Sequence, residues 1–288
     1  MPQTINTNLV SLNAQRNLST SQMSLSTAMQ RLSSGMRVNS AKDDAAGLAI
    51  AERMNTQVRG MNVAIRNAND GISMAQVGEG ALGKVSDLFQ RMRELAVQSA
   101  NGTNTDADRV SLNQEFMQLG QEVTRTLGGT QFNGMRILAT TDNSLFQIGA
   151  NNSSDIDQMV VTSFDWSSQT SITAVTGTAV ITGTEVPAMQ ITDTGTAQSA
   201  LGGIDAAIDA INSRRAEFGA VQNRFENVVS TLMVGAENQA AARSRIMDAD
   251  YAAETANLSR AQILQQAGNA MVAQANQLPQ QVLALLRN

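Results

Sequence analysis

The longest regular pattern in the chain runs through residues 54–96, MNTQVRGMNVAIRNANDGISMAQVGEGALGKVSDLFQRMRELA. One column of apolar or small side chains recurs there at every seventh position: Met54, Met61, Ala68, Ala75, Leu82, Phe89 and Ala96. Heptad spacing held over this length is typical of α-helices that pack lengthwise against other helices. The spacing therefore predicts a long helix over about residues 41–100, with Ser40 as its N-cap and Asp43 and Asp44 in its first turn.

The two ends of the chain carry the same pattern on a background of Ser, Asn, Gln and Ala. The front column is Leu18, Leu25 and Leu32, and the back column is Leu264, Met271, Leu278 and Leu285. A stripe this narrow is buried by laying it against one other helix, most economically the one at the opposite end of the chain. We therefore expect the two ends to form one structure together.

The region between these helices changes in character along the chain. After Asn101-Gly102 a shorter helix is expected through Leu127, and residues 145–148 and 156–162 read as the strands of a hairpin. The Thr-rich stretch 168–197 suggests exposed β structure or a flexible surface loop, and Ile204, Ile211, Phe218 and Phe225 begin another heptad column. The fold class expected is mainly α: an elongated, coiled-coil-like helical rod formed by the N- and C-terminal segments, with a β-hairpin and a small β-rich insert.

Composition excludes several classes of function. The 288 residues include no Cys and no His, so thiol nucleophiles, structural zinc sites and imidazole bases are absent. The net charge is −5 and no Lys/Arg-rich block is present, which argues against a nucleic-acid partner. No apolar run is long enough to span a membrane, and no ordinary cleaved secretory signal is visible at the N-terminus.

Two motifs could suggest chemistry. Residues 78–84, GEGALGK, resemble a phosphate-binding loop, but the helical register continues through them and Val85 stands where a Walker A loop needs Ser or Thr. Paired carboxylates, as at Asp106 and Asp108 or Asp248 and Asp250, lie at expected helix boundaries and favour capping over metal binding. We therefore expect no catalytic residue, no metal site and no cofactor.

Several sequence strings resemble those of bacterial flagellins. The most specific is LSSGMRVNSAKDDAAGLAIA at residues 32–51. Others are QRMRELAVQ at 90–98, TQFNG at 130–134, GAVQNRF at 219–225, ILQQAG at 263–268 and ANQLPQQVLALL at 275–286. The resemblance covers about residues 1–147 and 200–288 and leaves out the Thr-rich insert.

The resemblance implies a structural subunit of the flagellar filament, not an enzyme. Such subunits pass unfolded through the flagellar type III export pathway and polymerise outside the cell, beneath a cap protein, into the helical propeller for swimming. By this resemblance residues 1–40 and 250–288 form the filament inner core, residues 41–167 and 198–249 form the helical rod, and residues 168–197 form a variable, surface-exposed insert. The implied partners are other copies of the chain, the cap protein, hook-filament junction proteins, the export chaperone and the export apparatus.

The resemblance also implies recognition by innate immune receptors. Gln90, Arg91, Leu95 and Glu115 match flagellin positions contacted by the vertebrate Toll-like flagellin receptor. Val282, Leu283, Leu285 and Leu286 match the C-terminal region that cytosolic flagellin sensors read and that the export chaperone engages. A helix face and an apolar tail need the same residue types for packing, so these matches also have a purely structural explanation.

Three alternatives remain at this point. A hook-filament junction protein shares terminal helices and the export system with flagellins but forms a short ring. A nucleotide-dependent enzyme would be built on residues 78–84. A coiled-coil component of a secretion needle or an adhesin would lack the Phe132-Asn133-Gly134 region and the C-terminal match.

Overall fold

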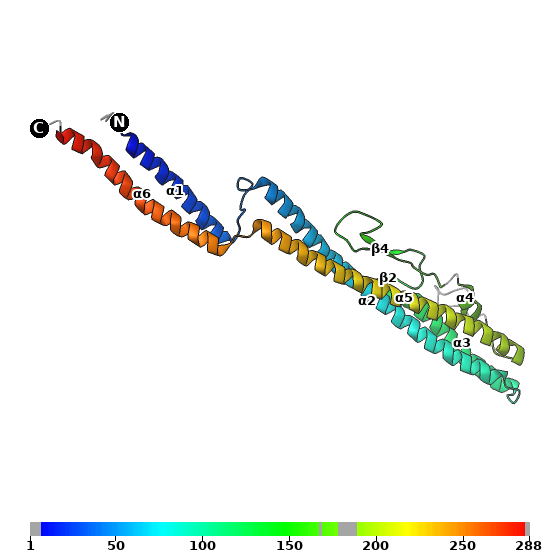
Figure 1. The fold of residues 1–288 in the computed structure, drawn as a ribbon. Coiled ribbons are helices and arrows are strands. Elements are labelled where there is room, and N and C mark those ends of the chain that lie inside the picture. The colour runs from blue at the N-terminus through cyan, green and yellow to red at the C-terminus, as the bar shows by residue number, and fades with distance from the viewer. Residues whose placement is uncertain (1–6, 167–168, 178–188, 286–288) are drawn as a thin grey trace. The chain divides into compact units, whose positions relative to one another are not determined.

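The structure is a computed structural model that describes residues 7–166, 169–177 and 189–285 (Figure 1). The chain divides into two compact units. One unit combines the two chain ends, Met1–Thr56 and Glu237–Asn288, and the other is Gln57–Ala236. Each unit is a helical assembly, and this confirms the mainly α fold class.

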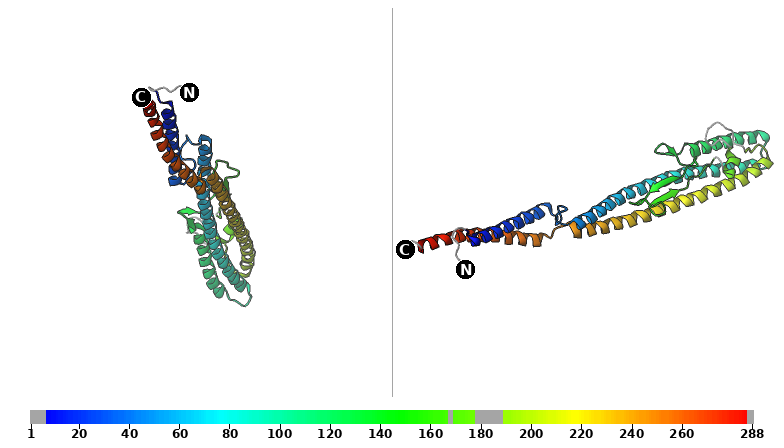
Figure 2. Two further views of the ribbon diagram at one scale, coloured as in Figure 1. Left: turned by 60° about the vertical axis from the view of Figure 1, so that its left-hand side comes forward. Right: turned by 90° about the horizontal axis from the view of Figure 1, so that it is seen from above.

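The terminal unit is built on two helices, α1 (Leu9–Ser34) and α6 (Tyr251–Leu285). They lie side by side and run antiparallel, as Figures 1 and 2 show. Ser11 near the start of α1 contacts Asn276 near the end of α6, whereas Arg31 at the other end contacts Glu254. The expectation that the two chain ends pair with each other is therefore confirmed.

A short crossing of two chain segments closes this unit at one end of the helix pair. Gly35 ends α1 in the left-handed conformation (φ 70°), and the next residue, Met36, forms an isolated antiparallel bridge with Asp248. The bridge carries two backbone hydrogen bonds, from Arg37 N to Met247 O (2.7 Å) and from Ala249 N to Gly35 O (2.9 Å). A small apolar cluster of Val38, Ala51 and Met247 is buried beside it.

Helix α2 (Ala45–Ala100) begins four residues later than expected. Asp44 caps it, because its carboxylate accepts a hydrogen bond from the backbone N–H of Gly47 at 2.8 Å. Asp43 instead closes a preceding turn, in which its carboxylate accepts from the backbone and hydroxyl of Ser40. The expected boundary was wrong because Ser40 and Asp44 are both residue types that suit an N-cap, and spacing alone does not show which of them starts the helix.

The second unit packs α2 against α5 (Thr194–Met247) and α3 (Asp106–Gly129). Both expected heptad columns are buried in its core: Ala68, Ala75, Leu82, Phe89 and Ala96 on α2, and Ile204, Ile211, Phe218 and Phe225 on α5. The helices approach closely at two glycines, because a Cβ at Gly71 would lie 2.6 Å from the Phe225 ring and one at Gly78 2.9 Å from the Phe218 ring. These pairs also show that α2 and α5 run antiparallel.

Helix α3 begins at a capping box. The Thr105 hydroxyl accepts a hydrogen bond from the Asp108 backbone N–H, and the Asp108 carboxylate accepts one from the backbone N–H of Thr105. Hydrogen bonds from the Thr105 hydroxyl and then from the Thr105 backbone N–H lower the pKa of Asp108. The helix buries Phe116, Val123 and Leu127 in the core of the unit. This carboxylate therefore serves a structural role, as its position predicted.

Two small antiparallel strand pairs accompany these helices. β1 (Gln131–Phe132) and β2 (Met135–Arg136) are joined by Asn133 and Gly134, both with positive φ (51° and 79°), as a tight hairpin turn of this twist requires. β3 (Ser144–Gln147) pairs with β4 (Gln158–Val161), which confirms the expected hairpin.

The Thr-rich stretch differs from expectation in the parts that the structure describes. Residues Thr170–Thr176 form a helix, α4, with Ile172 and Val175 fully buried. Ile191 is also fully buried, and its backbone N–H donates to the Asn113 side-chain oxygen at 2.9 Å. The prediction of exposed β structure or a flexible loop was therefore wrong here. Burial of these three apolar side chains stabilises an ordered conformation despite the Thr-rich composition around them. Residues 178–188 lie outside the described residues.

We expect substitution of Gly71 by Ala to lower the free energy of unfolding of the second unit by about 1–3 kcal/mol, since the new methyl group overlaps the buried Phe225 ring. Gly80→Ala is the matched control, because Gly80 lies in the same helix with no atom within 4 Å of the added carbon. This control should gain up to about 1 kcal/mol from helix propensity. Denaturant unfolding followed by fluorescence of the buried Trp166 measures both. Equal stability of the two variants would contradict the close helix approach.

Candidate interaction surfaces

The seam between α1 and α6 combines half-buried leucines of α1 with mostly small residues of α6, and the fully buried positions of α1 are Ser11 and Ala28. Leu18, Leu25 and Leu32 of α1 are half-buried along this seam, as their spacing predicts. The buried positions of α6 recur every seven residues and are Glu254, Ala261, Gly268 and Ala275, of which Gly268 is half-buried. A Cβ at Gly268 would lie 3.1 Å from the Leu18 side chain, so the helices are in close contact there.

The apolar column expected to form the seam on α6 does not do so. Leu264 is 51% exposed and Met271 is 59% exposed. Both lie three residues beyond a small seam residue, so they flank the contact with α1 instead of filling it. The prediction was wrong because large apolar residues were assumed to face the partner helix, whereas α1 already supplies the large side chains. The backbone of Leu278 and Leu285 belongs to α6, but their side chains lie outside the described set.

The terminal unit consequently exposes apolar surface on both of its helices. A groove of about 560 Å³ runs between α1 and α6, and its apolar walls include Leu9, Val10, Leu264 and Met271. Ile263, also on α6, is 66% exposed. A contiguous apolar surface of this kind marks an interaction site. The described residues of a single copy leave this surface exposed.

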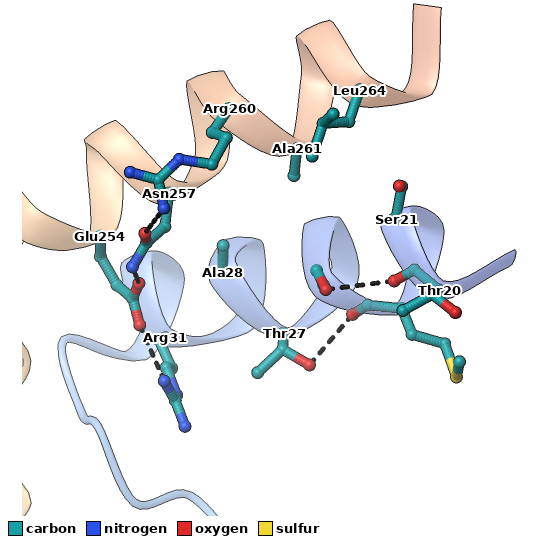
Figure 3. A pocket seen from close by; sticks show the side chains of 12 residues that line it. Thr20, Ser21, Thr27, Ala28, Arg31, Glu254, Asn257, Arg260, Ala261 and Leu264 are labelled. Atoms are coloured by element: carbon teal, nitrogen blue, oxygen red, sulfur yellow. Dashed lines mark hydrogen bonds and ion pairs between the residues drawn. The ribbon is translucent and has the colours of Figure 1, made fainter. Parts of the chain in front are cut away.

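A second groove in the same unit is lined mostly by residues with polar side chains (Figure 3). It has a volume of about 530 Å³ and is lined by residues that include Thr20, Thr27 and Ala28. At one end the Arg31 guanidinium lies 3.0 Å from the Glu254 carboxylate, whose side chain is 9% exposed. Hydrogen bonds from Asn257 and then from Arg31 lower the pKa of Glu254. This carboxylate is therefore held in its charged form inside the helix pair.

The four residues matched to Toll-like receptor recognition lie in the second unit, but they do not share one environment. Gln90, Arg91 and Glu115 are exposed, whereas Leu95 is 1% exposed and belongs to the core. Arg91 donates to Glu115 at 2.9 and 3.0 Å, and this contact ties α2 to α3. A further hydrogen bond, to Glu94, is the largest cause of the raised Arg91 pKa. Gln90, Arg91 and Glu115 are therefore accessible to a protein partner, whereas Leu95 is not.

An ion pair that the sequence did not reveal lies close to this surface. Arg93 of α2 donates to Asp205 of α5 at 2.7 Å. The two residues are far apart in the sequence, and only the antiparallel alignment of the helices brings them together. A shallow pocket of about 540 Å³ beside them is lined by Gln90, Arg93, Glu94, Val97 and Gln98.

The C-terminal residues matched to cytosolic sensors and the chaperone are only partly described. Val282, Leu283 and Leu285 belong to the α6 backbone, with their side chains outside the described set. Leu286 lies outside the described residues altogether.

The motifs that resembled catalytic chemistry are structural. Residues 78–84 lie within the uninterrupted helix α2, and Gly78 is buried against Phe218. Asp250 caps α6 by accepting from the backbone N–H groups of Ala252 and Ala253. Across the described ranges no group of three or more acidic side chains is placed to hold a metal ion. Among the same residues, no helix has the length and apolar character to cross a membrane.

Comparison with known proteins matches both halves of the chain to one family. The family model for the bacterial flagellin N-terminal helical region matches residues 5–143, and that for the C-terminal helical region matches residues 201–286. Flagellin of Halalkalibacterium halodurans is 46% identical over 284 residues, covering 98% of this chain and 99% of the relative. The flagellar filament 33 kDa core protein of Treponema phagedenis is 42% identical over 298 residues, with the same coverage.

A solved structure supports the fold. A protein described as flagellar hook-associated, from Vibrio parahaemolyticus, superposes with a TM-score of 0.58 over 72% of this chain and all of that structure, at 12% identity. This likeness concerns the fold alone, whereas the identity to flagellins spans nearly the whole chain. The chain therefore belongs to the bacterial flagellin family, whose members are structural subunits of the flagellar filament.

Proposed function

We propose that the chain leaves the cell through the flagellar type III export pathway and polymerises outside it, beneath the cap protein, without catalysing a reaction. Residues 1–40 and 250–288 would form the inner core of the polymer. Residues 41–167 and 198–249 would form the surrounding helical body, and residues 168–197 the variable segment. The observation that carries this proposal is the exposed apolar surface of the α1·α6 pair, which needs other copies to cover it.

The charge content of the C-terminal segment suits close packing of many identical copies. Between Asp250 and Asn288, two acidic and two basic side chains balance each other, and 11 of 39 residues are Gln or Asn. Like charges repel when identical surfaces meet, so a nearly uncharged, amide-rich surface avoids that cost. The low charge and the exposed apolar side chains therefore support the same role.

Residues 1 to about 40 and 250–288 would be disordered in the free subunit and fold on polymerisation. Much of the apolar surface of α1 and α6 stays exposed when only these two helices pair. Segments that bury too little apolar area alone order when a partner supplies the rest. Limited proteolysis of the free subunit should then trim both ends, and protected ends would contradict this part of the proposal.

We expect Leu264→Gln and Met271→Gln to raise the critical concentration for polymerisation by about tenfold or more. Each replaces an exposed apolar side chain whose burial against another copy is worth about 1.5 kcal/mol or more. Met135→Gln is the control, because Met135 is as exposed as Met271 but lies in a β-hairpin of the other unit. Sedimentation after seeding measures the effect. An unchanged critical concentration in both α6 variants would overturn the assigned assembly surface.

Recognition by the vertebrate Toll-like flagellin receptor would use Gln90, Arg91 and Glu115, with Leu95 supporting them from the core. The exposed side chains and the Arg91–Glu115 contact support this assignment, because they present one polar patch across two helices. Val282, Leu283, Leu285 and Leu286 would supply the segment that the export chaperone and the cytosolic sensors engage.

We expect Arg91→Ala to lower signalling potency in receptor reporter cells by about tenfold without loss of the fold. Leu95→Ala should also weaken signalling, but it should lower the free energy of unfolding by about 2–5 kcal/mol, since Leu95 is a core side chain. Arg125→Ala is the control, because it removes an exposed arginine of α3 that pairs only along its own helix, with Glu122. Unchanged potency of Arg91→Ala would refute the assignment.

A further inference from the structure

The α1·α6 seam repeats itself every seven residues. Leu18 packs on Gly268. A shift of α6 by one heptad would place Ala261 or Ala275 opposite the same leucine. Each alternative again sets a large apolar side chain against a small one. Most of the apolar contact of this seam therefore does not distinguish one alignment of the helices from the next.

The polar contacts where the start of α1 meets the end of α6 can also repeat after such a shift. The Ser11 hydroxyl donates to the Asn276 side-chain oxygen at 2.7 Å. Asn269 lies seven residues before Asn276, so the same hydrogen bond can form after a one-heptad shift. Asn8 donates to the backbone carbonyl of Ala275, a group that every residue offers. These contacts stabilise pairing without defining its alignment.

The contacts at the junction end do not repeat. Arg31 pairs with Glu254 at 3.0 Å, and α6 offers no other acidic residue beyond it. The Arg37 guanidinium donates twice to the backbone carbonyl of Ile246, at 2.8 and 3.2 Å. This is one of the last carbonyls of α5, which have no partner within the helix, so the contact marks the helix end in a way that a carbonyl inside a helix does not. The backbone bridge between Met36 and Asp248 lies beside these side chains. The contacts that distinguish one alignment of the helices from another therefore lie at one end of the helix pair.

We propose that Arg31, Arg37 and Glu254 act as positioning residues that set the register of α1 against α6, and that the rest of the seam pairs outward from them. A shifted alignment leaves the buried Glu254 carboxylate without its guanidinium, which is strongly unfavourable. A single charged or polar contact inside an otherwise repetitive helix seam is an established way to specify register. The inference concerns pairing within one chain and does not depend on the proposed export or receptor roles.

Cysteine cross-linking can test the register directly, because the chain has no cysteine of its own. One full-length variant carries Ser11→Cys with Asn276→Cys and reports the observed register. A second carries Ser11→Cys with Asn269→Cys and reports a one-heptad shift. Seven helical residues correspond to about 10 Å, which exceeds the reach of a disulfide, so the two pairs are mutually exclusive in one register. Both soluble subunits and sedimented filaments are oxidised and analysed. The expected yields apply to the filaments, because the two chain ends are proposed to be disordered in the free subunit.

In an otherwise unaltered chain we expect the first pair to cross-link about tenfold more than the second. Glu254→Arg should bring the two yields within about threefold of each other, and Arg37→Ala should move them in the same direction. Restoring the pair in reverse, with Arg31→Glu and Glu254→Arg together, should recover the original preference. Arg16→Glu is the control, since Arg16 is an exposed cation of α1 outside the junction.

An unchanged preference in Glu254→Arg would overturn the proposal, and so would failure of the reversed pair to restore it. Loss of cross-linking in both pairs of that variant would also overturn it, because the ion pair would then stabilise pairing without selecting its register. Fluorescence of the buried Trp166 shows in every variant that the second unit remains folded.

Discussion

Close approach of long helices, permitted by small side chains on one of them, is the constraint on which both units depend. In the second unit Gly71 and Gly78 of α2 receive the rings of Phe225 and Phe218. In the terminal unit Gly268 of α6 lies against the Leu18 side chain of α1, and Ala261 and Ala275 of the same helix are buried. Interiors are packed without room for extra methylene groups, so this pairing of large with small leaves little tolerance for added volume. The chain therefore needs few aromatic residues, because a few large side chains suffice where the backbones are close.

The same division of sizes explains which parts of the fold could be predicted. Heptad spacing located the long helices and their buried columns, because residues such as Leu82 and Phe225 have no other way to be buried. It failed on α6, where the large residue Leu264 lies outside the seam and the small residue Ala261 lies within it. Periodicity identifies a helix and the columns of side chains that recur along it every seven residues. It does not show which of two neighbouring columns faces the partner helix.

The residues proposed for receptor recognition were also predictable only in part from the sequence. Resemblance located the positions of Arg91 and Glu115, and the structure brings these two into contact. It could not show that Leu95 is buried, or that Arg93 pairs with Asp205 across the unit, because both depend on how α2 rotates against its neighbours. The Thr-rich stretch posed the opposite problem. Its composition suggested exposure, whereas single apolar residues such as Ile172 are anchored in the core.

The anchoring of that stretch has a consequence for how such a chain can change in length. On one side Ile172 and Val175 of α4 are buried, and on the other Ile191 is held through its backbone by Asn113 and Ser99. The described contacts of the two anchors are made by residues outside 178–188, so we expect changes of length in that segment to leave those contacts in place. Insertions and deletions in this segment are therefore expected to leave the packing of α2, α3 and α5 unchanged.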